Sequence, residues 1–146
     1  VLRDADFPAV PTWEEPPQAP EGQFYLLTGK VAQHTQFATQ NNKLLHERAP
    51  DNPLWINTKA AAERNINEGD EVWVESAAAK VKTTAHVTEF IRPDCVYMTP
   101  GFGHVSKALR TAYGVGASDS DLHLTFTDRI SGSQALSQTT VKVTKG

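Results

Sequence analysis

NTKAAAERNINEGDEVWV, residues 57–74, predicts a helix, a sharp turn and a strand in direct succession. Its first half is built from strong helix formers, and Asn57 or Thr58 can cap the amino end of the helix. Gly69 permits the positive φ of a tight turn, and Asp70 can accept hydrogen bonds from backbone N–H groups of a neighbouring loop. The stretch therefore predicts a capped helix that leads through a glycine–aspartate turn into a strand.

Short apolar or alternating segments on both sides of this unit predict further strands. In the strand after the turn, Val72 and Val74 share one face and Trp73 lies on the other. The expected strands are 24–28, 54–56, 71–76, 81–87, 95–98 and 139–143. A short helix or an irregular segment is expected at 39–47, and a short helix at 106–113 within a long loop rich in Gly and Ser. This pattern predicts a mainly β fold, a barrel with short helical insertions.

The composition is that of an ordinary soluble protein, with 39% hydrophobic and 21% charged residues among 146. The net charge of −3 provides no basic surface for a nucleic acid. No apolar run approaches the roughly 20 residues that span a bilayer. We therefore expect neither nucleic-acid binding nor direct membrane insertion.

The composition changes near residue 22. Residues 1–22 are rich in proline, so we expect a linker from a preceding domain, and residues 23–146 are expected to form the folded body. Trp13 could pack the linker against that body. The chain begins with Val1 and its only methionine is Met98, so we expect it to be a piece of a longer protein.

The sequence lacks the motifs of a self-sufficient catalytic centre. It contains no HExxH, no CxxC, no Walker A loop and no GxSxG elbow. Gly101-Phe102-Gly103 begins like a dinucleotide-binding glycine motif, but Ser106 stands in the place of the third glycine. We expect no catalytic residue and no metal ligand within this chain, and a binding role fits better.

Three further segments, taken together with residues 57–74, resemble the corresponding segments of one protein family. They are YLLTGK (25–30) followed by His34-Thr35, YMTPGFGH (97–104) and DRISGSQAL (128–136). In order and spacing they are similar to the C-terminal molybdopterin dinucleotide-binding domain of molybdopterin oxidoreductases, the dimethyl sulfoxide reductase superfamily. The likeness runs from about Phe24 to Val143. It implies a double-psi β-barrel that binds part of a molybdenum bis(molybdopterin guanine dinucleotide) cofactor shared with other domains of the parent.

Within the superfamily, the run GASDSDL (116–122) is most similar to the catalytic subunits of thiosulfate and polysulfide reductases. That resemblance implies a parent oxidoreductase that acts on inorganic sulfur compounds, and a fragment that is inactive alone. It also implies a periplasmic location and association with iron–sulfur and membrane-anchor subunits.

The resemblance and the local chemistry together select a set of cofactor-binding residues. Backbone N–H groups in a strand-ending turn can bind phosphate or pterin oxygens, and a lysine adds charge. Hydroxyl, carboxylate and amide groups can bind the edges of guanine or pterin. The expected residues are Thr28, Gly29, Lys30, His34, Thr35, Gly103, His104, Ser118, Ser120, Asp121 and Gln134.

The sequence departs from the family pattern at two of these positions. Lys30 stands where arginine is usual, which replaces bidentate contact with a point charge. Ser120 stands where many relatives have asparagine, which leaves that contact in doubt.

Plainer interpretations of the same residues remain open. The segment 28–30 is also compatible with an ordinary turn, His34 with a solvated loop, Gly103 with a plain glycine turn and 118–121 with a solvated polar loop. Two other classes of protein remain as alternatives. One is a stand-alone double-psi barrel adaptor without a cofactor, and the other is a small barrel enzyme that would use Gly132-Ser133 for self-processing.

Overall fold

The computed structural model describes residues 8, 10, 12–13, 15–125, 127–128 and 131–146. The six expected strands are confirmed, with ends shifted by up to two residues. They are β1 (Phe24–Thr28), β2 (Leu54–Asn57), β3 (Glu71–Glu75), β4 (Lys80–Thr88), β5 (Cys95–Met98) and β6 (Thr140–Lys145). The helical elements are α1 (Lys43–His46), α2 (Thr58–Ala62) and the 3-10 turns η2 (Ser120–Leu122) and η3 (Leu136–Gln138).

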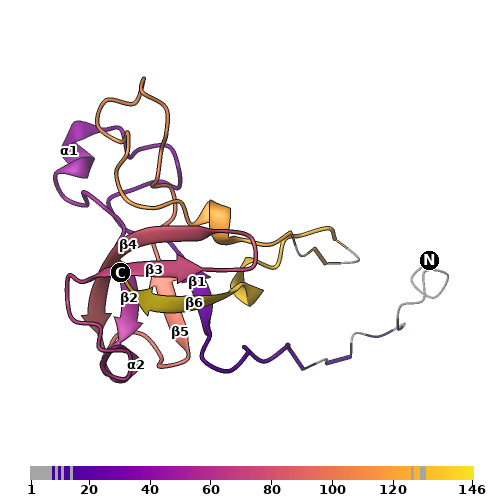
Figure 1. Ribbon diagram of the computed structural model, residues 1–146. Coiled ribbons are helices and arrows are strands. Elements are labelled where there is room, and N and C mark those ends of the chain that lie inside the picture. The colour runs from indigo at the N-terminus through magenta and orange to yellow at the C-terminus, as the bar shows by residue number, and fades with distance from the viewer. Residues whose placement is uncertain (1–7, 9, 11, 14, 126, 129–130) are drawn as a thin grey trace.

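The strands close into a barrel in the order β1-β5-β2-β4-β3-β6. The pairs β1–β5 and β2–β4 are parallel, and the other neighbours are antiparallel. The fold is therefore the mainly β, double-psi β-barrel with short helical insertions that the sequence predicts. Figure 1 shows α2 against one end of the barrel, while α1 and the loop around residue 110 form a separate lobe beyond the other end.

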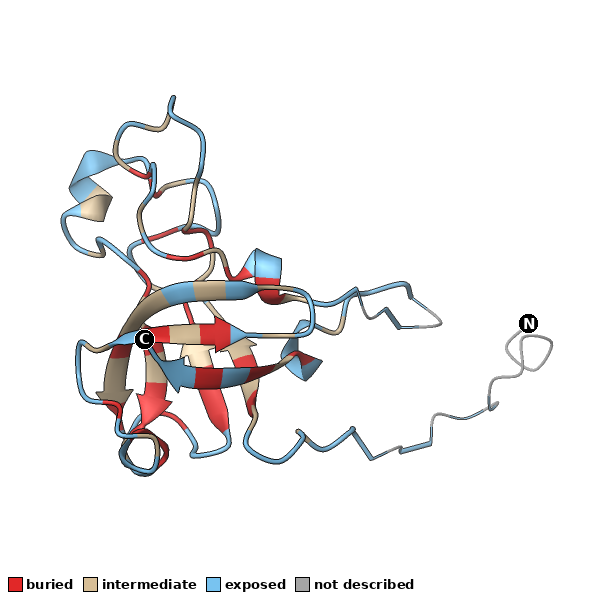
Figure 2. Cartoon of the chain, viewed as in Figure 1, coloured by how far each residue is buried: buried red, intermediate tan, exposed pale blue. Residues whose placement is uncertain are grey.

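The barrel interior is filled by one side of each strand, as the alternation requires. Val72 and Val74 are fully buried there, whereas Trp73 on the opposite face is half-buried. The Lys80 and Lys82 ammonium groups lie 5.1 and 5.7 Å from the Trp73 ring centroid. In Figure 2 the buried positions lie mainly on the strands, and the lobe contributes shorter buried segments.

The helix–turn–strand unit forms as expected, with one correction. Asn57 caps α2, because its Oδ1 accepts the Lys59 N–H at 3.0 Å. Gly69 adopts a φ of 78°. The Asp70 carboxylate does not receive N–H groups from a neighbouring loop: its Oδ2 accepts the Asn67 N–H of its own turn and the Lys145 ammonium of β6, both at 2.7 Å. The bond from Lys145 holds the Asp70 pKa below its ordinary value.

The helix expected at 106–113 is wrong. The segment forms turns, and His104 makes a parallel bridge with Tyr113. The physical reason is that Asn41 Oδ1 accepts the N–H groups of Thr111 (3.0 Å) and Ala112 (3.4 Å). This competes with the backbone carbonyls that a helix would offer to the same N–H groups.

The approach to the barrel is fixed by Tyr25 and not by Trp13, whose side chain is exposed. The Tyr25 hydroxyl donates to the Pro17 carbonyl at 2.7 Å and accepts the Ala19 N–H at 2.8 Å. Among the described residues, no helix is both long enough and apolar enough to cross a bilayer.

The Gly69 turn yields a stability prediction. A Cβ at Gly69 would meet no atom within 4 Å, so Gly69→Ala carries only the cost of the positive φ. We expect a loss of about 1 kcal/mol in the free energy of unfolding, measured by urea denaturation. Gly69→Asn is the control and should lose less, because asparagine tolerates this conformation better. A loss several times larger would contradict a purely conformational role.

Candidate functional site

Asn52 holds together the chain segments that surround the site. It is completely buried just before β2. Its Nδ2 donates to the carbonyls of Thr99 and Ala117, both at 2.8 Å, and its Oδ1 accepts the Ala117 N–H at 2.9 Å. The loop after β5 and the segment before η2 are therefore fixed to the same side chain. The Thr83 hydroxyl of β4 donates to the Asn52 carbonyl at 3.2 Å, which ties this clamp to the barrel.

Gly103 lets the same two segments approach closely. Its N–H donates to the Val115 carbonyl at 2.8 Å, its φ is 76°, and a Cβ there would collide with the backbone of Ser118. Gly103 is thus needed for contact between two parts of the chain. Its near neighbour Ser118 is half-buried against it.

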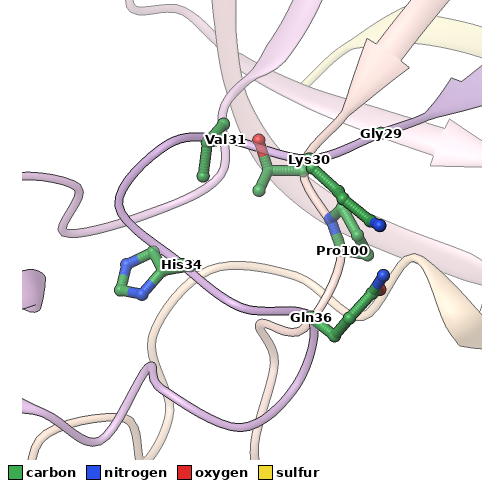
Figure 3. A pocket seen from close by; sticks show the side chains of 7 residues that line it. Gly29, Lys30, Val31, His34, Gln36 and Pro100 are labelled. Atoms are coloured by element: carbon green, nitrogen blue, oxygen red, sulfur yellow. The ribbon is translucent and has the colours of Figure 1, made fainter.

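Two adjoining hollows lie beside these segments. The first, called here the notch, is drawn in Figure 3 and is lined by Gly29, Lys30, Val31, His34, Gln36, Thr99 and Pro100. The second, called here the cleft, has a volume of about 270 Å³ and is lined by Thr28, Gln36, Phe37, Pro100, Asp119, Ser120, His123, Gln134 and Leu136. Because Gln36 and Pro100 line both, the notch and the cleft form one continuous surface.

This surface brings together about half of the residues selected from the sequence. Gly29, Lys30 and His34 line the notch, and Thr28, Ser120 and Gln134 line the cleft. Gln134 is exposed, and its Nε2 donates to the Leu124 carbonyl at 3.3 Å. The others do not line either hollow: Thr35, Gly103, His104, Ser118 and Asp121.

His34 is not a solvated loop residue, since its side chain is buried. Its Nε2 lies 2.9 Å from the Ala49 carbonyl and its Nδ1 lies 3.3 Å from Thr39 Oγ1. The ring also packs edge-to-face on Phe102, with 5.5 Å between centroids. Both ring nitrogens are therefore engaged within the chain. In Figure 3 His34 lies on one side of its loop, while Lys30 and Gln36 extend together on the other.

Thr35 and His104 are likewise engaged through their backbones. The Thr35 N–H donates to Thr39 Oγ1 at 2.8 Å, and the His104 carbonyl accepts the Gly114 N–H at 2.8 Å. Asp121 is exposed on η2. These residues belong to loops beside the notch and the cleft, but their side chains line neither hollow.

Two cleft residues, Asp119 and His123, are absent from the set selected from the sequence. Asp119 Oδ1 accepts the Gly101 N–H at 3.4 Å, and His123 Nδ1 pairs with Thr139 Oγ1 at 2.8 Å. Burial raises the pKa of Asp119 and lowers the pKa of His123. The sequence signal that could have identified this pair is the spacing of four residues between Asp119 and His123, which lie on either side of the fully buried Leu122.

The groups on this surface suit a flat, polar ring beside an anionic group. Hydroxyl, amide and carboxyl groups stand around the cleft, Phe37 and Leu136 expose apolar area for a ring face, and Lys30 places an exposed ammonium side chain at the notch. Within the part of the chain that the structure describes, no three His, Cys, Asp or Glu side chains are placed to hold a metal ion. These features fit an organic dinucleotide.

The fold and the site define a closed β-barrel domain with a polar cleft beside it. More narrowly, the chain belongs to the family described as "Molydopterin dinucleotide binding domain", that is, the molybdopterin dinucleotide-binding domains, whose model matches residues 24–140. This confirms the family resemblance found in the sequence.

Two known proteins that are similar to the chain are much longer than it is. It is 40% identical over 107 residues to the thiosulfate reductase molybdopterin-containing subunit PhsA of Salmonella typhimurium, covering 72% of this chain and 14% of that protein. Its fold is similar to part of acetylene hydratase from Pelobacter acetylenicus, with a TM-score of 0.83 and 16% identity over 99% of this chain and 22% of that one. The chain thus spans less than a quarter of either protein.

The Asn52 clamp yields a second prediction. Asn52→Ala leaves two carbonyls and one N–H without their partner, so we expect a loss of about 3 kcal/mol in the free energy of unfolding. Asn41→Ala is the control, because Asn41 also accepts two backbone N–H groups but is exposed. It should lose less than about 1 kcal/mol. Equal losses in urea denaturation would show that Asn52 has no special role.

The lowered pKa of His123 yields a third prediction. The folded protein favours the neutral His123 ring, and this preference contributes to the free energy of unfolding. The contribution is complete above the unfolded-state pKa of about 6.5, and it is lost as the pH falls through the lower folded-state pKa. We compare wild type with His123→Asn, whose amide can keep the bond to Thr139. The difference in unfolding free energy should fall as the pH is lowered from about 7.5 to about 5. The other histidines are common to both proteins, so a constant difference would contradict the assignment.

Proposed function

We propose that this domain binds the molybdopterin guanine dinucleotide of a molybdenum oxidoreductase, as one wall of a cofactor site completed by the rest of the parent. The observation that carries the proposal is the cleft of about 270 Å³, which lies between loops that all belong to the region matched by the family model. Family membership favours this function over a cofactor-free adaptor or a self-processing enzyme.

Each part of the surface has a role in this proposal. Lys30 and the turn at Gly29 attract the negative charge of a phosphate. Phe37 and Leu136 pack against the face of a heterocycle, while Ser120, Gln134 and Thr28 hydrogen-bond its edge. Thr35, His104, Ser118 and Asp121 remain candidates that would need the loops to rearrange. When bound, the cofactor supplies the metal and its electron transfer, whereas the chain supplies affinity and orientation.

The finer identity of the parent rests on the thiosulfate reductase relative and on the likeness of residues 116–122. We propose a thiosulfate or polysulfide reductase catalytic subunit, located in the periplasm with iron–sulfur and membrane-anchor subunits as partners. Assays of the whole parent with thiosulfate and with polysulfide as alternative electron acceptors test the substrate. Activity with neither compound would overturn this part of the proposal.

The binding role itself is tested by Lys30→Gln. We expect the variant to bind GDP, the phosphate-bearing half of the cofactor, about tenfold more weakly than the wild-type chain, because one charge-assisted hydrogen bond is lost. The measurement is an NMR titration that follows the amides of the notch and the cleft. Lys30→Arg should bind at least as well as wild type, since arginine keeps the charge.

Lys43→Gln is the matched control, because it removes the same charge from α1, outside the notch and the cleft. Its affinity for GDP should equal that of the wild-type chain. Equal affinities of the Lys30 and Lys43 variants would contradict a phosphate contact at the notch.

A further inference from the structure

His123 carries an unused hydrogen-bonding atom in the wall of the cleft. The side chain is 6% exposed, and its Nε2 is buried without a hydrogen-bond partner. The ring is oriented from its other side, where Nδ1 lies 2.8 Å from Thr139 Oγ1. Buried polar atoms are normally paired, so an unpaired one beside a cleft points to a bound group that completes it.

Asp119 stands beside this atom but is not hydrogen-bonded to it. Asp119 Oδ2 is 3.9 Å from His123 Nε2, which is too long for a hydrogen bond. Both side chains line the cleft. Burial lowers the pKa of His123 and so favours its neutral ring, while the Asp119 charge acts in the opposite direction. A neutral ring that donates from Nδ1 to Thr139 presents the lone pair of Nε2 beside an acidic side chain.

We propose that His123 and Asp119 together accept two neighbouring N–H groups from the 2-amino-4-oxopyrimidine edge of the ligand. Guanine and pterin share this edge, which carries a ring N–H next to an amino group. Adenine lacks it, because its ring nitrogen at the corresponding position is an acceptor. The inference rests on the proposed cofactor-binding function and assigns recognition of this edge to His123 and Asp119.

Because Nε2 is buried, a ligand reaches it only when neighbouring side chains move. Ser120 and Gln134 beside it are exposed, and Gln134 is attached by a bond of 3.3 Å. Two residues next to His123 are buried. Leu122 precedes it in the chain, and Thr139 is bonded to its Nδ1. The recognition pair is therefore held by buried neighbours and shares its cleft with exposed side chains.

The test uses the 146-residue chain and two variants, each of which places an amide near only one of the two imidazole nitrogens. His123→Asn keeps an amide where Nδ1 meets Thr139 and removes Nε2, whereas His123→Gln places an amide near Nε2. Long-range ¹⁵N–¹H NMR follows the His123 ring nitrogens during titration with GMP, with 6-carboxypterin and with AMP.

We expect GMP or the pterin to shift the His123 Nε2 resonance, and AMP to leave it unchanged. The probe that shifts it identifies which half of the dinucleotide lies at this position. His123→Asn should weaken binding of that probe about tenfold, and His123→Gln should stay within about threefold of wild type. His86, which is half-exposed and lines neither hollow, provides an internal reference.

Two results would overturn the inference in distinguishable ways. If GMP or the pterin shifts the amides of Lys30 and Gln134 while His123 Nε2 and the affinity of His123→Asn stay unchanged, the recognition pair is wrong and the proposed function stands. If neither probe shifts any amide of the notch or the cleft, the proposed function fails together with the inference.

Discussion

The three hydrogen bonds of the Asn52 amide are the constraint on which the site depends. They join the end of the loop before β2 to the loop after β5 and to the segment before η2, at a position with no exposed surface. Few side chains other than an amide could donate to two carbonyls and accept one N–H at a single buried point. Pro100 and Asp119, which both line the cleft, each lie within two residues of a backbone group that Asn52 holds, although Asn52 does not line the cleft itself.

The barrel gives this clamp a rigid base. β2 begins two residues after Asn52 and pairs with β4 and β5, so the clamp is attached directly to the barrel wall. The loops beyond it are held by local bonds, such as those of Asn41 to Thr111 and Ala112. The molecule thus combines a densely packed β body with loops whose shape is set by single polar side chains. This is a common division between scaffold and binding surface.

The sequence predicted the barrel well because its strands depend on local alternation and on recognisable turns such as Gly69-Asp70. It predicted the site less completely. Thr28, Lys30 and Gln134 were selected and do line the hollows, whereas His123 and Asp119 were overlooked because their relation to Thr139 and Gly101 appears only in three dimensions. The helix expected at 106–113 failed for the same reason, since Asn41 lies about seventy residues away. In the sequence, Asn52 lies in Pro50-Asp51-Asn52-Pro53, a pattern typical of a turn that gives no sign of the buried bonds.

The closure of the barrel bears on the order in which this domain would fold and bind its proposed cofactor. Each of the six described strands has a neighbour on both sides, so none of them is an edge strand open to pairing with another chain. The core cluster of the described residues, which includes Leu26, Ile56 and Val72, is buried by the chain itself. Under the proposed function, the cofactor would therefore bind late, to a barrel that is already folded. An open sheet awaiting its ligand would instead be exposed to aggregation during that interval.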